Sequence, residues 1–170
     1  MSDKNPVVTI RDARPMDQAQ LRRAVVELQE FERKLHKSRL PGEQIADAYL
    51  AWIENQIGED GALLIAEIDH CFVGFVAGWI EHGDAIAETT EANRFGYISD
   101  ICVMPEFRGQ RIATRLLSAI EERLSCRGIT RIRISSLVAN SSARASYERA
   151  GYAPYEITYE RSAAGGVASE

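Results

Sequence analysis

The residues best suited to do chemistry form a sharp turn between an apolar strand and an amphipathic helix. Residues 103–113 read V-M-P-E-F-R-G-Q-R-I-A, so Pro105 breaks the strand and Arg108 and Gly109 make the turn. The first turn of the following helix presents backbone N–H groups without intrahelical partners, together with a partial positive charge. Such a helix start attracts phosphate groups. The sequence therefore predicts a phosphate site at residues 108–113.

The turn belongs to the first of two strand-turn-helix units. Its helix is indicated by apolar residues at spacings of three and four, and it ends at Gly128. The second unit has the apolar run Ile132–Val138, then Asn140, then a short helix that stops at Gly151. Parallel strands require crossover connections of this kind. We therefore expect Tyr97–Val103 and Ile132–Val138 to be parallel neighbours, with both helices packed against the sheet.

The first half of the chain predicts further elements of an α/β fold. They are a strand at Val7–Ile10, a helix from Asp17 to about His36, a second helix entered through Pro41 and Gly42, and two apolar runs at Ala62–Ile68 and Phe72–Ile80. The two runs flank Asp69 and His70 and predict a hairpin with a short turn. Because the runs are apolar on both faces, helices are expected to cover both sides of the sheet.

Three segments are less regular. The polar stretch His82–Phe95 is interpreted either as a mobile loop near the site entrance or as a solvated hairpin tip. Ile157–Glu160 is expected to form a last strand. The ordered core is expected to span about residues 6–161, and the small, polar residues 162–170 are predicted to be disordered.

The composition is that of one globular domain, residues 1–170, with 45% hydrophobic and 26% charged residues. The net charge of -5 argues against nucleic acid as the main partner, since backbone phosphates bind basic surfaces. No apolar run approaches the ~20 residues that cross a membrane. The N-terminal residues lack the apolar core of a signal peptide. We therefore expect no membrane partner and a cytoplasmic location.

The cysteines and histidines do not predict a metal centre. Cys71, Cys102 and Cys126 are odd in number and lack C-x-x-C spacing, and the three histidines also lack the spacing of metal ligands. Cys102 lies on the strand before the turn, where a nucleophile would be useful. No histidine is near it in the sequence, and a cysteine in a strand is more often part of the core. No metal is expected.

Two motifs resemble those of the GCN5-related N-acetyltransferase (GNAT) family. Residues 108–113, R-G-Q-R-I-A, are similar to its Q/R-x-x-G-x-G/A pyrophosphate loop, and V-M-P at 103–105 precedes them as V-x-P does in that family. Residues 140–152, N-S-S-A-R-A-S-Y-E-R-A-G-Y, resemble its N-x-x-A-x-x-x-Y-x-x-x-G-F/Y segment. The resemblance covers about a third of the chain. It implies one N-acetyltransferase domain with a mixed, mostly antiparallel sheet, a parallel pair at the coenzyme site, and helices on both faces.

By this resemblance the chain binds acetyl-CoA as a co-substrate. The pyrophosphate would meet the loop residues Arg108, Gly109, Gln110, Arg111, Ile112, Ala113 and Thr114. The pantetheine arm would bond to the backbone of the strand at Ile101, Cys102 and Val103, and would contact Asn140, Ser142 and Tyr147. Asn140 has a second interpretation, because its side chain is also suited to cap the helix that follows.

Arg111 departs from the family pattern, which usually has glycine at this position. Glycine is used where the backbone adopts a positive φ or approaches a ligand closely. Arginine there predicts an ordinary helical backbone, with a side chain that leaves the loop sideways. Its guanidinium is predicted either to lie near the phosphates, where it would add positive charge, or to be solvated.

Acetyl transfer to an amine needs an acid for the departing thiolate and a base for the amine. Tyr147 is the predicted acid, because a phenol with a pKa of about 10 stays protonated at neutral pH. The alternative is a tyrosine packed on the sheet edge. Asp100 and Glu81 are the candidate bases, with water chains or a surface position as alternatives. Glu30 and Glu32 either receive the amine or belong to a solvated helix face.

The acceptor is left open by the sequence. In diamine acetyltransferases of the family an E-D pair occupies the positions of Ser99 and Asp100, and peptide N-terminal acetyltransferases often have a glutamate at the position of Ser135. The resemblance implies transfer from acetyl-CoA to a primary amine of a small molecule or peptide, by direct attack in a ternary complex. The alternative is a non-catalytic acyl-CoA sensor, which would not need a proton donor at Tyr147. Because dimers are common in the family, a homodimer is a further option.

Overall fold

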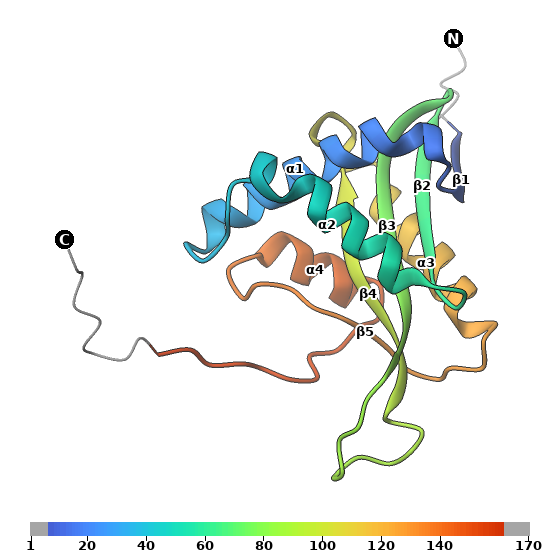
Figure 1. Ribbon diagram of the computed structural model, residues 1–170, viewed down its shortest axis with the longest axis vertical. Coiled ribbons are helices and arrows are strands. Elements are labelled where there is room, and N and C mark those ends of the chain that lie inside the picture. The colour runs from blue at the N-terminus through green and yellow to red at the C-terminus, as the bar shows by residue number, and fades with distance from the viewer. Residues whose placement is uncertain (1–6, 162–170) are drawn as a thin grey trace.

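The computed structural model describes residues 7–161 (Figure 1). In chain order its elements are β1 (Val8–Asp12), η1 (Pro15–Asp17), α1 (Gln18–Leu35), α2 (Gly42–Ile57), β2 (Ala62–Ile68), β3 (Cys71–His82), β4 (Arg94–Val103), η2 (Pro105–Phe107), α3 (Ile112–Ser125), β5 (Ile132–Ile134) and α4 (Ser141–Arg149). The predicted α/β class is confirmed. The single domain over 1–170 stays a prediction, and the segment predicted to be disordered, 162–170, lies outside the described residues.

The sheet is mostly antiparallel and contains one parallel pair. The strand order is β1-β2-β3-β4-β5, and each of the first four strands pairs antiparallel with the next. β4 and β5 run parallel, with Tyr97 opposite Arg133. The prediction of parallel neighbours is therefore confirmed. The predicted length of the last strand, Ile132–Val138, is wrong, because β5 ends at Ile134.

A bulge in β4 explains why β5 ends early. Asp100 and Ile98 lie opposite consecutive residues of β3, so Ser99 between them is an extra residue in the register. A bulge of this kind bends its strand and increases the local twist. The pairing with β5 stops at Ile98, and beyond that point β4 pairs only with β3 among residues 7–161. The last part of β4 is therefore open on the side that faces away from β3.

Helices cover both faces of the sheet, as expected from the two apolar runs. α1 and α2 cross one face, and α3 lies behind the other (Figure 1). One core cluster joins the sheet to α1 and α2 and includes Leu21, Ile53 and Phe75. The second joins the sheet to α3, with Leu116 and Ile120 among its buried members, and α4 packs against it. Each buried side chain of this size contributes about 1.5–3 kcal/mol, so both helix layers are held by hydrophobic burial.

The predicted hairpin is formed by β2 and β3. Asp69 and His70 have positive φ values of 49° and 64°, as in a two-residue type I′ turn, whose twist matches that of the flanking strands. β1 pairs with β2 as far as Asp12. It therefore continues two residues beyond its predicted end at Ile10, because β2 offers backbone partners there.

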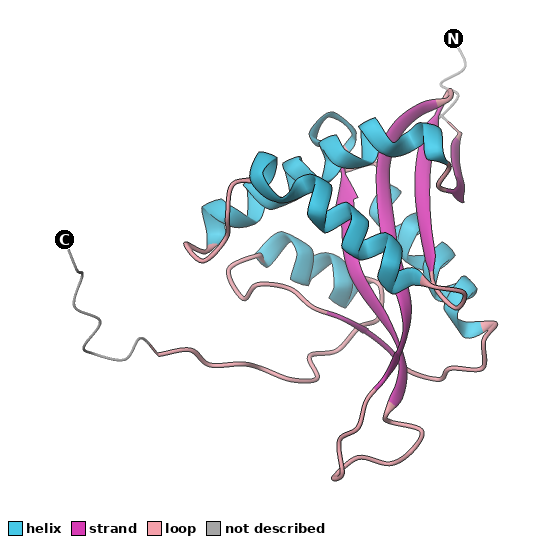
Figure 2. Cartoon of the chain, viewed as in Figure 1, coloured by secondary structure: helices cyan, strands magenta, loops and turns pink. Residues whose placement is uncertain are grey.

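The predicted strand Ile157–Glu160 is wrong. After α4 the chain is loop as far as residue 161 (Figure 2), and the Tyr159 side chain is 89% exposed. A strand is stable only with a neighbour that bonds to its backbone. Within residues 7–161 no strand lies beside this segment. Its alternating pattern therefore reflects a local preference without the pairing that a sheet requires.

Candidate active site

The open edge of β4 is where three separate parts of the chain bring the predicted site residues together. β4 itself carries Asp100, the turn before α3 follows at the end of this strand, and α4 carries Tyr147. The negative charge of Asp100 acts on the pKa of Tyr147, so the two side chains lie close enough to interact. The structure therefore joins the two predicted motifs at one place.

The turn before α3 is braced by the side chain of Arg108. Its Nε donates to the Val103 carbonyl at 3.0 Å, and its Nη2 pairs with Glu27 of α1 at 3.1 Å. The guanidinium also lies over the Phe31 ring, 5.7 Å from its centroid. This side chain thus ties the end of β4 to α1. The backbone of the turn is the part left to meet a phosphate.

Arg111, the N-cap of α3, has a left-handed backbone with φ of 59° and ψ of 18°. The prediction of an ordinary helical backbone here is wrong. The chain has to change direction between Gly109, with φ of 80°, and the helix, and a positive φ at Arg111 completes that change. Its side chain gives no capping hydrogen bond to the first turn of α3. The amides of Ile112, Ala113 and Thr114 therefore have no side-chain cap from this residue.

Replacing Arg111 with glycine is expected to raise the free energy of unfolding by about 0.5–1 kcal/mol, because glycine lacks the Cβ that makes this backbone costly. Thermal denaturation should show a Tm increase of about 2 °C. The same variant tests the guanidinium, and we expect its KM for acetyl-CoA to rise severalfold. Arg115→Gly, one turn further along α3, is the matched control and should lower Tm. An unchanged KM in Arg111→Gly would mean that this guanidinium is only solvated.

Tyr147 packs its ring against the core and lies 6.2 Å from the Tyr152 ring, measured between centroids. Burial raises the pKa of Tyr147 to about 12, and the negative charges of Glu32 and Asp100 add to the rise. The phenol therefore keeps its proton across the physiological pH range. Packing against the sheet and service as an acid are thus compatible for this side chain.

Asn140 caps α4, because its Oδ1 accepts a hydrogen bond from the Ala143 amide at 3.1 Å. Substituting such a cap by alanine typically costs about 1 kcal/mol. The capping interpretation is confirmed, and the predicted helix follows it over Ser141–Arg149. The contacts of Asn140 and Ser142 with pantetheine stay predictions, as do those of the loop residue Gln110 with pyrophosphate.

The Asp100 carboxylate is buried, with 6% of the residue exposed. The Tyr49 hydroxyl donates to its Oδ1 at 2.9 Å, and Oδ2 has no hydrogen-bond partner within residues 7–161. Burial raises the pKa of this carboxyl, although the Tyr49 hydroxyl opposes the rise. A buried polar atom without a partner is costly and is a feature of functional sites. The interpretation of Asp100 as a surface carboxylate is therefore wrong.

Glu81, the other candidate base, lies apart from Asp100. It follows four positions after Ala77, the residue of β3 opposite Asp100, which is about 13 Å along the strand. Its Oε1 accepts a hydrogen bond from Trp79 Nε1 at 2.7 Å. The two carboxylates therefore occupy different ends of one face of the sheet.

The two acids of α1 have different surroundings. Glu30 accepts a hydrogen bond from the backbone N–H of Gly42 at 2.7 Å, so it holds the start of α2 against α1. The charge of Glu32 acts on both Tyr147 and Asp100. Glu32 is therefore the member of this pair that lies near the predicted catalytic residues.

Cys102 is a core residue, as expected, and burial raises the pKa of its thiol to about 12. A thiol that keeps its proton is a poor nucleophile. In the described part of the chain, 7–161, no group of three or more His, Cys, Asp or Glu side chains is placed to hold a metal ion. No helix of this part is both long and apolar enough to cross a membrane. Metal independence and a cytoplasmic location stay predictions.

The loop over residues 83–93 joins β3 to β4, so it lies at the opposite end of β4 from the turn that precedes α3 (Figure 1). Most of it is exposed, and the Gly83 amide closes it by donating to the Asn93 carbonyl at 2.6 Å. The Tyr155 hydroxyl donates to Glu88 in this loop at 3.1 Å. The prediction of a loop is confirmed, whereas its mobility and its place at the site entrance stay predictions.

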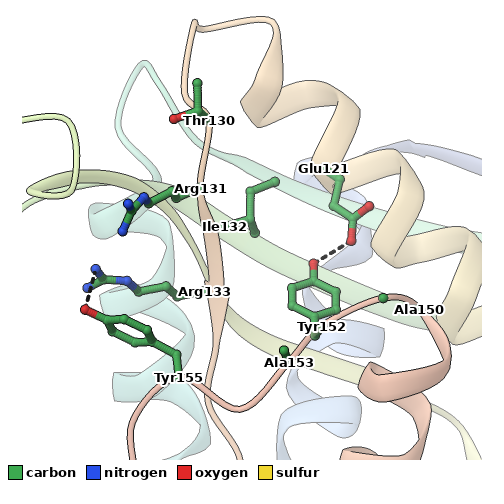
Figure 3. A pocket seen from close by; sticks show the side chains of 10 residues that line it. Glu121, Thr130, Arg131, Ile132, Arg133, Ala150, Tyr152, Ala153 and Tyr155 are labelled. Atoms are coloured by element: carbon green, nitrogen blue, oxygen red, sulfur yellow. Dashed lines mark hydrogen bonds between the residues drawn. The ribbon is translucent and has the colours of Figure 1, made fainter.

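A groove of about 470 Å³ borders β5 and the chain after α4 (Figure 3). The Tyr152 hydroxyl donates to Glu121 at 2.5 Å within it. Arg133 lies between two rings, with its Cζ 3.9 Å from the centroid of Phe95 and 4.5 Å from that of Tyr155. None of the predicted site residues lines this groove. It is therefore separate from the candidate active site.

Four aromatic residues next to Asp100 escaped the sequence analysis as site residues. Tyr49 and Trp52 belong to α2, Trp79 to β3 and Tyr97 to β4, and each ring contacts the next. In the sequence they read as ordinary members of apolar runs. The available signal was the wide apolar stripe of the second helix, whose Trp52 is 43% exposed.

Comparison with known proteins places this geometry in context. Residues 25–152 match the family model described as the acetyltransferase (GNAT) family. The chain is 30% identical over 148 residues to thialysine N-epsilon-acetyltransferase of Mus musculus, which covers 84% of this chain and 82% of that protein. It is 38% identical over 64 residues to N-alpha-acetyltransferase 30 of Schizosaccharomyces pombe, a match that covers 38% of this chain and 43% of that relative, less than half its length.

Solved structures share the fold. The aminoglycoside N-acetyltransferase AAC(6')-Iy in complex with CoA superposes with a TM-score of 0.70 at 17% identity, over 97% of this chain and 100% of that chain. The BH1408 protein from Bacillus halodurans superposes with a TM-score of 0.73 at 19% identity, over 91% of this chain and 99% of that chain. At these identities the likeness establishes the architecture of the sheet and helices.

Proposed function

Because the chain belongs to the acetyltransferase (GNAT) family and is an N-acetyltransferase, we propose that it moves the acetyl group of acetyl-CoA to a primary amine of a small molecule or peptide, by direct attack within a ternary complex. One observation carries this proposal. A buried carboxyl with an unpaired oxygen, on Asp100, and a phenol that keeps its proton, on Tyr147, interact across the open edge of β4. An acid and a base are thus available at one place.

Acetyl-CoA is proposed to lie along the open part of β4. Its pantetheine arm would bond to the backbone of Ile101 and Val103 as an added strand does, and its pyrophosphate would accept hydrogen bonds from the amides at the start of α3. The open edge beyond Ile98 supports this position. The solved complex of AAC(6')-Iy with CoA supports the choice of ligand.

The reaction follows from these positions. Asp100, directly or through water, takes one proton from the acceptor ammonium, and the free amine attacks the thioester carbonyl carbon. A backbone N–H of the Ile101–Val103 segment stabilises the oxyanion while the N–C bond forms. The C–S bond then breaks, and Tyr147 donates its proton to the departing thiolate. The second proton of the nitrogen restores the phenol, and the proton on Asp100 leaves to solvent.

The acceptor remains at the level of a primary amine. By their names, one relative acetylates the ε-amine of thialysine and the other acts on α-amines. The two share amine acetylation and differ in what surrounds the amine. Their joint similarity therefore supports the reaction type, and the acceptor must be argued from this chain's own residues.

Release of free thiol from acetyl-CoA across a panel of amines tests the proposal. We expect thiol release that depends on the amine and on the protein, with an acetylated amine as the second product. A protein that binds acetyl-CoA and releases no thiol with any amine would instead be the acyl-CoA sensor considered above. Binding of acetyl-CoA is measured separately, by calorimetry, so that the two results are distinguishable.

A further inference from the structure

A row of four aromatic rings crosses the face of the sheet that α1 and α2 cover. We call Tyr49, Trp52, Trp79 and Tyr97 the aromatic row. Tyr49 stacks on Trp52 with centroids 5.4 Å apart, Trp52 meets Trp79 edge-on at 5.5 Å, and Trp79 meets Tyr97 at 5.7 Å. The rings therefore form one continuous surface from α2 to β4.

The β4 bulge puts this row on the same face as Asp100. Residues 97 and 100 are three positions apart, and in a regular strand they would point to opposite faces. The extra residue Ser99 restores them to one face, where Tyr97 meets Trp79 and Asp100 meets Tyr49. The carboxyl beside the proposed thioester and the aromatic surface are therefore parts of one site.

A carboxylate lies at each end of the row, and neither is neutralised by a cation. Asp100 accepts from Tyr49, and Glu81 accepts from Trp79. Both donors are uncharged, and within residues 7–161 neither acid takes part in a salt bridge. Their separation is about 13 Å along the strand. The site thus holds two negative groups for which this part of the chain supplies no counter-ion.

The row is open to solvent. Trp52 is 43% exposed, and Tyr49, Tyr97 and Glu81 are half-buried, whereas Trp79 beneath them is buried. Aromatic faces attract ammonium and guanidinium groups, and the attraction strengthens where water is partly excluded. A surface of rings between two carboxylates therefore favours a cation at each end. An acceptor with a single amine would leave one end unused.

We propose that the acceptor is an extended aliphatic amine with two positive groups, of the polyamine type. The amine that is acetylated lies at Asp100, and the second cation lies against Trp52 and Tyr97 beside Glu81. This inference rests on the proposed function, because it names the acceptor of the same reaction. It also gives Glu81 a part in acceptor binding instead of the part of a base.

The first test compares acceptors that differ only in the distal group. Linear diamines of increasing length are assayed against amino alcohols in which a hydroxyl replaces the second amine. We expect kcat/KM to be about tenfold higher for diamines than for matched amino alcohols once the chain reaches Glu81, mainly through a lower KM. Equal values for the two series, or a preference for a neutral or acidic distal group, would overturn the proposal.

The second test removes the distal contacts. In Trp52→Leu and Glu81→Gln we expect the preference for diamine over amino alcohol to fall about tenfold. Glu43→Gln, which removes a negative charge from the exposed side of α2, is the control that keeps the preference. The KM for acetyl-CoA and a thermal denaturation curve report whether each variant is folded. An unchanged preference in Trp52→Leu and Glu81→Gln contradicts the inference.

A binding measurement is independent of turnover. The chain contains two tryptophans, and both belong to the aromatic row. Addition of a diamine should therefore change the intrinsic tryptophan fluorescence, and the matched amino alcohol should do so only at higher concentration. If amines are acetylated but the diamine has no advantage in rate or binding, this inference fails and the proposed function stands. If no amine releases thiol, the proposed function itself fails.

Discussion

Asp100→Asn is expected to lower kcat/KM for the amine about 10²–10⁴-fold, the range for loss of a general acid or base. The change keeps the size of the side chain and removes the group that takes a proton from the ammonium. Tyr49 donates to Oδ1 in the native protein and has the amide oxygen as an acceptor in the variant. The KM for acetyl-CoA should therefore stay near its native value. Steady-state kinetics with both substrates varied would measure this.

The same variant should be at least as stable as the native protein. Burial raises the pKa of Asp100 in the folded state above its unfolded value. The ionised carboxylate therefore destabilises the fold, and the stability present below the unfolded pKa is lost as pH rises through the folded pKa. Asparagine has no such charge, so Tm at neutral pH should equal or exceed that of the native protein. Loss of activity together with a large fall in Tm would point to a structural role.

The pH profile provides a further check on Asp100. As pH falls through the raised pKa of this carboxyl, the base becomes protonated and kcat/KM should fall. This acid limb should lie at a higher pH than an exposed aspartate would give, and it should be absent from the residual activity of Asp100→Asn. An acid limb that is identical in both proteins would assign the proton transfer to another group or to water.

Tyr147→Phe is expected to lower kcat about 10²–10³-fold and to leave the affinity for acetyl-CoA nearly unchanged. The variant keeps the ring that packs against the core and removes the hydroxyl that donates to the thiolate. Because burial raises the pKa of Tyr147 to about 12, the native phenol should cause no loss of rate between about pH 8 and 10. Single-turnover measurements would separate this chemical step from product release.

Tyr152→Phe is the matched control for Tyr147→Phe. Its ring lies against that of Tyr147, and its hydroxyl donates to Glu121 of α3 instead of facing β4. The loss of this hydrogen bond should lower stability by about 1 kcal/mol and leave kcat close to its native value. Equal losses of kcat in both variants would mean that packing, and not proton donation, explains the effect at Tyr147.

Arg111 shows how a prediction from residue type can fail while the position keeps its structural part. The family usually has glycine here, and the arginine adopts the same left-handed backbone, at φ of 59°, that glycine would adopt. The cost is about 1–2 kcal/mol. The geometry of the turn is therefore imposed by the chain on both sides, which has to pass from the end of β4 into α3. A residue that is strained at the proposed phosphate site is a reasonable target for both stability and affinity measurements.

The coenzyme turn, the amphipathic helix after it and the Asn140 cap were predictable from the sequence. Each is a local feature, set by a few consecutive residues whose dihedral preferences and helix-end hydrogen bonds do not depend on distant parts of the chain. The two apolar runs and their turn at Asp69 and His70 were predictable for the same reason. Local rules also placed Tyr147 on the helix that carries it.

Tertiary structure alone determined which side chains share the amine side of the site. The extra residue Ser99 changes which face of the sheet each later residue of β4 meets, and a shift of one residue reverses every side chain. That shift brings Asp100 into the layer of Tyr49 and Trp79, in contact with α2. The expected strand at Ile157–Glu160 failed because a strand depends on a neighbour, and neighbours are a property of the folded chain.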